Sequence, residues 1–208
     1  MKKMRATFAL LLLIFGLCPT AWSQSVWPAG KTALMIIDIQ EFYFPGGVSE
    51  LREPERATAN TALLLDYFRA QGWPVVHIGH RSSKQQDFYP QVSPGEGEYI
   101  LMKEKVNAFA SGELHAYLQQ QGITHLIICG MQTHMCVEAA TRAAADLGYD
   151  CTLVRDACAT RDLKFQDAVI PAQMVHNSTL ATLSGTYAKI SEARPLLGEL
   201  MKMQEGKN

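Results

Sequence analysis

Residues 125–148 have the sequence HLIICGMQTHMCVEAATRAAADLG, which predicts a strand, a turn and a helix in succession. The apolar run His125–Cys129 is short and uninterrupted, as expected of a strand buried on both faces. Gly130 ends this run, and Gly148 follows the alanine-rich segment as a helix terminator would. A strand that leads into a helix is the repeating unit of a parallel sheet covered by helices.

The same alternation of short apolar runs and amphipathic stretches begins at Ala33. The predicted strands are Ala33–Ile39, Pro74–His80, Tyr99–Met102, His125–Cys129, Asp150–Asp156 and Tyr187–Ile190. The predicted helices are Arg56–Gln71, Gly112–Gln121, Thr133–Leu147, Pro171–Leu183 and Leu196–Lys202. The sequence therefore predicts a three-layer, doubly wound α/β fold, in which a mainly parallel six-stranded sheet has helices on both faces and binds ligands at the carboxyl ends of its strands.

Composition and charge limit the class of protein. The chain has 208 residues, of which 48% are hydrophobic and 19% are charged, as in a single soluble globular domain. The net charge is −1, and no basic stripe with interleaved aromatic residues is present, so the sequence offers no nucleic-acid-binding surface.

The N-terminus predicts export. A basic start, Met1–Arg5, precedes the apolar run Phe8–Leu17 and the small residues of Ala21-Trp22-Ser23. This order is typical of a secretory signal peptide. We expect a signal peptide over residues 1–23, a hydrolase domain over 24–208 and a periplasmic location. The alternatives are a retained anchor or a buried first helix, but the apolar run is shorter than the ~20 residues that span a bilayer, so we expect no stable membrane insertion after leader cleavage.

Cleavage would leave four cysteines, Cys129, Cys136, Cys151 and Cys158. Export would permit disulfides, but spacing alone does not pair the cysteines. All except Cys136 lie in or beside apolar strand-like segments, where a free cysteine commonly serves as a small buried side chain.

Cys136 is expected in the first turn of the helix that follows Gly130. Unpaired backbone N–H groups and the helix dipole lower the pKa of a thiol at this place, and the same N–H groups could stabilise an oxyanion. A cysteine near a helix start is, however, more often a small packed residue.

Asp38 and Lys103 lie near the carboxyl ends of two other predicted strands. A charged residue at the end of an apolar run needs a partner or a function. Asp38 could equally cap a helix or pair with a basic residue. Spacing does not distinguish Lys103 from Lys105, and either could be an ordinary surface lysine.

Three ordered segments resemble the isochorismatase-like cysteine hydrolase superfamily over roughly residues 31–190. They are Ile36–Gln40 with Phe44–Gly47, Lys103–Phe109, and Gly130–Val137 with its following helix and Asp156–Thr160. The resemblance implies a catalytic triad of Asp38 as general base, Lys103 and a nucleophilic Cys136, and it selects Lys103 over Lys105. It also implies a cis peptide between Met131 and Gln132, an oxyanion hole formed by the N–H groups of Gln132 and Cys136, no cofactor, and assembly as a homodimer or homotetramer.

Residues next to the catalytic strand ends are candidates for substrate binding, although each could instead serve in packing. They are Gln40, Phe42, Tyr43, His80 and His134. Nicotinamidases of this superfamily hold a metal with an aspartate-x-histidine pair and a further histidine. The chain lacks that set, and His77 with His80 is a pair without a matched carboxylate, so no metal is expected.

The predicted activity is cysteine-dependent hydrolysis of a small amide, lactam or ureido C–N bond through a thioester. The sequences Pro45–Gly47 and Thr133–Cys136 resemble those of streptothricin-hydrolase-like amidohydrolases, which open a cyclic amide. One alternative is an isochorismatase-like ether hydrolase, for which Cys136 would be dispensable. The other is a non-catalytic binding protein on the same fold, in which Cys136 would be an ordinary thiol.

Overall fold

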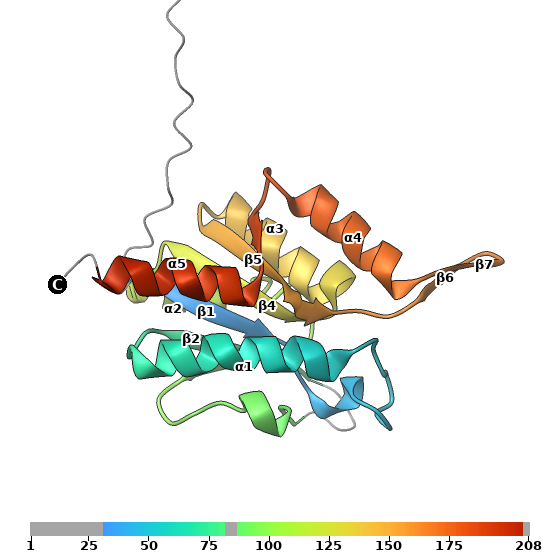
Figure 1. Ribbon diagram of the computed structural model, residues 1–208, viewed down its shortest axis with the longest axis horizontal. Coiled ribbons are helices and arrows are strands. Elements are labelled where there is room, and N and C mark those ends of the chain that lie inside the picture. Colours follow the sequence, from blue (N-terminus) through green and yellow to red (C-terminus); the bar gives the residue numbers. More distant parts are fainter. Residues whose placement is uncertain (1–30, 82–86, 206–208) are drawn as a thin grey trace, which may run out of the picture.

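The computed structural model describes residues 31–81 and 87–205; the predicted signal peptide lies outside these ranges. One six-stranded parallel sheet has the strand order β3-β2-β1-β4-β5-β8 (Figure 1). Its strands are β1 (Thr32–Ile37), β2 (Val75–His80), β3 (Tyr99–Lys103), β4 (His125–Met131), β5 (Asp150–Ala159) and β8 (Lys189–Ser191). All six predicted strands are therefore present, and the strand order reverses at β1, as in a doubly wound sheet.

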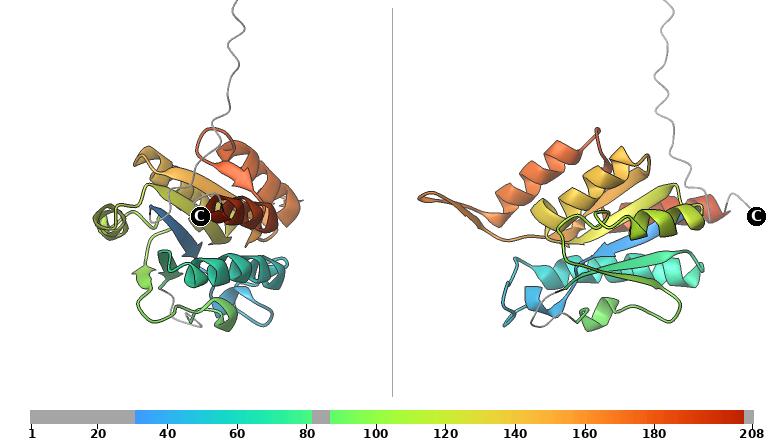
Figure 2. Two further views of the ribbon diagram at one scale, coloured as in Figure 1. Left: turned by 60° about the vertical axis from the view of Figure 1, so that its left-hand side comes forward. Right: turned by 180° about the vertical axis from the view of Figure 1, so that it is seen from behind.

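Helices cover both faces of the sheet. Helices α1 (Pro54–Ala70) and α5 (Ala193–Glu205) pack together on one face. Helices α2 (Glu113–Gln120), α3 (Glu138–Asp146) and α4 (Ala172–Leu183) lie on the other (Figure 2). The predicted three-layer α/β fold is confirmed.

Strand β1 is buried along its whole length, which explains its unbroken apolar sequence. It pairs in parallel with β2 on one side and with β4 on the other. At its carboxyl end, Ile37 lies opposite Gly130, where an added Cβ would be 2.0 Å from the Ile37 carbonyl oxygen. Gly130 also has a φ of +126°, so glycine alone fits this position. The close approach brings the residues after β1 beside the turn after β4.

The structure contains short elements that the sequence did not predict. The turn after β4 forms a π-helical turn, η3 (Thr133–Val137), before α3 begins. A hairpin of β6 (Leu163–Phe165) and β7 (Ala168–Ile170) was not predicted, because its strands are only three residues long and lack a buried face. Two short 3-10 turns, η1 (Glu41–Tyr43) and η2 (Pro90–Val92), complete the described elements.

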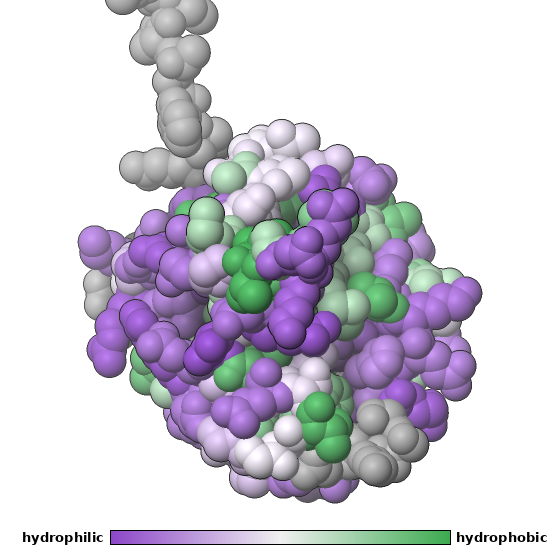
Figure 3. All heavy atoms as spheres, turned by 90° about the vertical axis from the view of Figure 1, so that its right-hand side faces the viewer, coloured by the Kyte–Doolittle hydropathy of each residue, from purple (hydrophilic) through white to green (hydrophobic). Residues whose placement is uncertain are grey.

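The hairpin projects from the side of the molecule at which the parallel strands end (Figure 1). Figure 3 shows this side, where hydrophobic side chains are scattered among hydrophilic ones rather than gathered in one broad patch. Within residues 31–81 and 87–205, no helix combines the length and the apolar character needed to cross a bilayer.

Candidate active site

Asp38, Lys103 and Cys136 converge at the carboxyl edge of the sheet. Asp38 follows β1, Lys103 is the last residue of β3, and Cys136 lies within η3. Lys103 Nζ donates hydrogen bonds to Asp38 Oδ2 at 2.8 Å and to Cys136 Sγ at 3.3 Å. The exposed fractions of the three residues are 0%, 6% and 4%. The structure therefore brings together the three residues that the sequence nominated.

The backbone and the environment of Asp38 are both unusual. Its φ is +50°, a left-handed conformation that turns the chain sharply at the end of β1. Its Oδ1 atom is buried and accepts no hydrogen bond from the described residues. Burial raises the pKa of Asp38, and the nearby charge of Lys103 offsets this rise only in part. Asp38 thus has an unoccupied oxygen and an increased affinity for a proton.

The pKa of the Cys136 thiol differs from the value expected from the sequence. Burial, together with the negative charge of Asp38, raises the pKa of its thiol to about 12. The expectation of a pKa lowered by a helix N-terminus is wrong for this structure, because η3 places the thiol in a buried site beside a carboxylate. In the resting site the cysteine is a thiol, and it needs a base to become a nucleophile.

His80 and Gln40 lie beside Lys103 but are held differently. Lys103 Nζ lies 3.3 Å from His80 Nδ1. The Gln40 side chain is fully buried; its Nε2 donates to the His80 carbonyl at 3.1 Å, and its Oε1 accepts from the His80 N–H at 2.7 Å. Gln40 was nominated for substrate binding, and both polar atoms of its amide bond to the His80 backbone, which holds the end of β2 in place.

The remaining nominated residues form another side of the site. Gln132 Nε2 donates to Tyr43 Oη at 3.3 Å, and the rings of Phe42 and Tyr43 are in contact, with centroids 4.2 Å apart. The Met131–Gln132 peptide is cis, as the resemblance implies. His134 Nδ1 lies 2.6 Å from Thr160 Oγ1.

Comparisons with known proteins identify the family of the chain. Residues 32–183 match the family described as the isochorismatase domain. The chain belongs to the isochorismatase family. The uncharacterized isochorismatase family protein YddQ of Bacillus subtilis is 38% identical over 177 residues, 80% of this chain and 98% of that protein.

Two further proteins are similar to this isochorismatase-family chain. The crystal structure of an isochorismatase from Pseudomonas putida KT2440 is 37% identical and superimposes with a TM-score of 0.76, covering 81% of this chain and 93% of that one. A streptothricin hydrolase of Streptomyces noursei is 32% identical over 140 residues, 63% of this chain and 50% of that protein.

Sequence reasoning did not nominate Arg161 and Thr160, which both contact the site of this isochorismatase-family protein. Arg161 Nε donates to Gln132 Oε1 at 3.1 Å, and Thr160 contacts His134. Both residues directly follow β5, the neighbour of β4 in the sheet. The rule that parallel strands meet at their carboxyl ends could have identified them.

Two cavities border the site without containing the whole triad. A cavity of about 260 Å³ reaches Lys103 and is otherwise lined by residues of the 101–113 segment. A larger cavity, of about 590 Å³, lies beside the ends of β5, α1 and α4, and Arg52, Arg56 and Arg155 are among its lining residues. The nominated site residues do not line the larger cavity.

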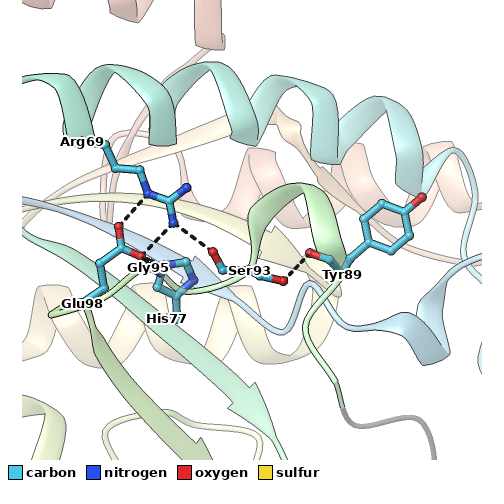
Figure 4. Close-up of polar contacts among 6 residues, drawn as sticks. All are labelled: Arg69, His77, Tyr89, Ser93, Gly95 and Glu98. Atoms are coloured by element: carbon cyan, nitrogen blue, oxygen red, sulfur yellow. Dashed lines mark hydrogen bonds and ion pairs between the residues drawn. The ribbon is translucent and has the colours of Figure 1, made fainter.

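His77 was weighed as a metal ligand together with His80, but it belongs to a separate cluster (Figure 4). His77 Nε2 lies 2.8 Å from Glu98 Oε2, and Arg69 donates to both Glu98 oxygens at 2.7 and 2.9 Å. The N–H of Gly95 also donates to Glu98, at 2.6 Å. Over the described residues, no group of three or more His, Cys, Asp and Glu side chains is arranged to hold a metal.

The other described cysteines, Cys129, Cys151 and Cys158, are buried free thiols. Burial raises the pKa of both Cys129 and Cys151 to about 12. Like Cys136, they are protonated at neutral pH. Cys136 is distinguished by its contact with a lysine that also holds a carboxylate.

Proposed function

We propose that this isochorismatase-family protein is a cysteine-dependent hydrolase that cleaves the C–N bond of a small amide, lactam or ureido compound through a thioester. The observation that carries the proposal is the position of Lys103 Nζ, which contacts both Asp38 Oδ2 and Cys136 Sγ. A nucleophile, a base and a cation within hydrogen-bond reach of one another form the arrangement that cysteine catalysis requires.

Acylation begins when the Cys136 thiol passes its proton to Asp38 as the sulfur attacks the carbonyl carbon of the substrate. The unoccupied Oδ1 of Asp38 is the atom we assign to this proton. Burial raises the pKa of both the Cys136 thiol and the Asp38 carboxyl. We therefore propose that the proton moves from sulfur to Asp38 while the sulfur attacks, so that no free thiolate forms first. Lys103 stabilises the negative charge as it moves from carboxylate to sulfur.

The tetrahedral intermediate collapses when Asp38 returns its proton to the departing nitrogen, so that ammonia or an amine leaves and a thioester remains. Asp38, again a carboxylate, then takes a proton from water as the water oxygen attacks the thioester. Release of the carboxylic acid and return of the proton to sulfur restore the Cys136 thiol. In both steps we assign the oxyanion to the backbone N–H groups of Gln132 and Cys136.

The substrate-facing side chains of this proposal are Phe42, Tyr43, His80 and His134. The amide of Gln40 is assigned to positioning, because both of its polar atoms bond to the His80 backbone. The relative named streptothricin hydrolase supports hydrolysis as the class of reaction. The proposed mechanism uses no cofactor or metal.

The test is release of ammonia or amine from a panel of small amides, lactams and ureido compounds, measured for the wild type and for Cys136→Ala. Cys151→Ala is the matched control, because Cys151 is also a buried thiol but lies on β5. Turnover that is lost in Cys136→Ala and kept in Cys151→Ala supports the proposal. Turnover that survives Cys136→Ala would refute Cys136 as the nucleophile and with it the proposed thioester.

We also propose that the protein acts outside the cytoplasm after removal of residues 1–23, from the order of basic, apolar and small residues in this segment. N-terminal sequencing of the protein recovered from a periplasmic extract should begin at Gln24. Recovery of the uncleaved chain from the cytoplasm alone would refute export.

A further inference from the structure

Arg161 is a cation at the candidate active site that the proposed mechanism does not use. It follows β5 in the loop before the hairpin, and its side chain is exposed. Its Nε donates to Oε1 of Gln132, a residue that is 4% exposed and bonds through its other amide atom to Tyr43. One hydrogen bond therefore anchors the guanidinium group to the buried turn that carries the nucleophile.

Arg161 lacks the carboxylate partner that most arginines of this protein have. Arg52, Arg69 and Arg142 each form an ion pair with an aspartate or glutamate at 2.9 Å or less. Arg161 forms no ion pair with the side chains that the structure describes. The adjacent carboxylate, Asp162, is occupied by Arg52 and by the N–H of Ala172.

The charges around the nucleophile are therefore unbalanced. Lys103 and Asp38 compensate each other in a 2.8 Å ion pair, and the Cys136 thiol is neutral because its pKa is raised. Burial, and then the positive charge of Arg161, lower the pKa of His134, so His134 is also neutral at pH 7. Arg161 leaves this edge of the site with an excess positive charge.

We propose that Arg161 binds a carboxylate, or a comparable anionic group, of the substrate. The inference rests on the proposed cysteine-hydrolase function and narrows its substrate class to short amides that carry an anion. A guanidinium group recognises a carboxylate with charge-assisted and often paired hydrogen bonds, and all of its nitrogens except Nε are without a hydrogen bond to the described residues. Arg161 is thus a specificity-determining residue: it places the substrate, and Cys136 performs the attack.

Alkylation of Cys136 by iodoacetate and by iodoacetamide tests the inference without a known substrate. The two reagents are nearly the same size and release the same iodide, but only iodoacetate carries a carboxylate. The rate of each reaction at Cys136 is measured by mass spectrometry of the peptide that contains it, with Cys136→Ser as the blank. Lys103 also attracts the anionic reagent, so the informative quantity is the change in the rate ratio when Arg161 is substituted.

The wild type should react about tenfold or more faster with iodoacetate than with iodoacetamide, and the preference should shrink with added salt. In Arg161→Gln the ratio should fall to about one or below, because only iodoacetate has a charge for the guanidinium group to attract, and Arg161→Lys should restore part of the ratio. Arg194→Gln is the matched control, because Arg194 is also exposed and forms no ion pair with the described residues but lies on α5 beyond the edge strand β8.

Three results would overturn the inference. Equal rates of the two reagents in the wild type, or a preference that persists in Arg161→Gln, would show that Arg161 does not select anions, while leaving Cys136 as the nucleophile. Failure of both reagents to alkylate Cys136 faster than the other buried cysteines would instead refute the proposed nucleophile, and the inference would fall with it.

Discussion

Asp38 and Glu98 are the carboxylates of two separate polar clusters. Strand β2 contributes a histidine to each: His80 lies in the cluster of Asp38, and His77 lies in the cluster of Glu98. Each carboxylate bonds to a cation, Lys103 for Asp38 and Arg69 for Glu98. Their electrostatics are nevertheless opposite. The pKa of Asp38 is raised, whereas that of Glu98 is lowered to about 2.

The difference follows from the depth of burial, which is complete for Asp38, and from the number of partners. Burial raises the pKa of both groups, but Glu98 accepts hydrogen bonds from Arg69, Gly95 and His77, which together more than offset it. Asp38 has one oxygen bonded to Lys103 and one without a partner. A carboxylate whose oxygens are all occupied stabilises the fold, and a carboxylate with an unoccupied buried oxygen can accept a proton.

The largest expected difference between the two carboxylates is in their contribution to catalysis. Asp38→Asn should lower kcat for amide hydrolysis by about 10³- to 10⁴-fold, because the amide cannot accept the thiol proton. The protein should still melt cooperatively in circular dichroism, since the amide oxygen can still accept a hydrogen bond from Lys103. Glu98→Gln, the counterpart in the other cluster, should change kcat less than threefold. Equal losses in the two variants would contradict the distinction between them.

The second expected difference is in stability, to which the charge of Glu98 contributes. The pKa of Glu98 falls from 4.5 to about 2 on folding, so the ionised carboxylate contributes stability above pH 4.5 that is lost as the pH falls towards 2. Glu98→Gln should lower the free energy of unfolding by about 3 kcal/mol at pH 7 in urea denaturation. The difference from the wild type should shrink as the pH approaches 2.

Glu104→Gln is the control for this stability measurement, because Glu104 is 80% exposed and lies 3.8 Å from Arg81. It should have almost no effect on unfolding at either pH. A Glu98→Gln difference that is constant between pH 7 and pH 2 would mean that the charge of Glu98 is not what stabilises the cluster.

The strands and the residues at their carboxyl ends could be predicted from the sequence. The apolar runs located every strand of the main sheet, most clearly the central strands β1 and β4, which are buried on both faces. Asp38, Lys103 and Cys136 were nominated because they lie at the ends of such runs within recognisable segments. The topology brings Asp38 and Cys136 together, since they follow the adjacent strands β1 and β4, and Lys103 reaches both of them from β3 beyond β2.

Side-chain partners beyond the strand ends were not predictable in this way. Gln40 and Arg161 both lie near strand ends, yet one bonds to the backbone and the other lacks an ion pair. The pKa of Cys136 depends on burial and on the distance to Asp38, neither of which the position of a helix start reveals. Glu98 lies outside the predicted helices and strands, and its three partners come from separate segments.

The third effect tests the coupling between Lys103 and Asp38. The charge of Lys103 lowers the pKa of Asp38, so Lys103→Met should raise that pKa further. Because Asp38 must be ionised to accept a proton, the acidic limb of the kcat/KM profile should move to higher pH by about one unit or more. Lys105→Met, an exposed neighbour, should leave the limb in place. An unmoved limb in Lys103→Met would mean that the limb does not report Asp38.

The smallest effect comes from an ion pair that belongs to neither cluster. Arg56 and Glu53 lie 3.2 Å apart, but their side chains are 73% and 71% exposed, so water and salt screen their attraction. Arg56→Gln should lower the free energy of unfolding by less than about 0.5 kcal/mol, even though its ion pair is of ordinary length. A loss in urea denaturation comparable to that of Glu98→Gln would mean that proximity of charges alone determines their contribution. A negligible loss would instead place the cause in burial and in the number of hydrogen bonds, which are the two quantities that separate Glu98 from Asp38.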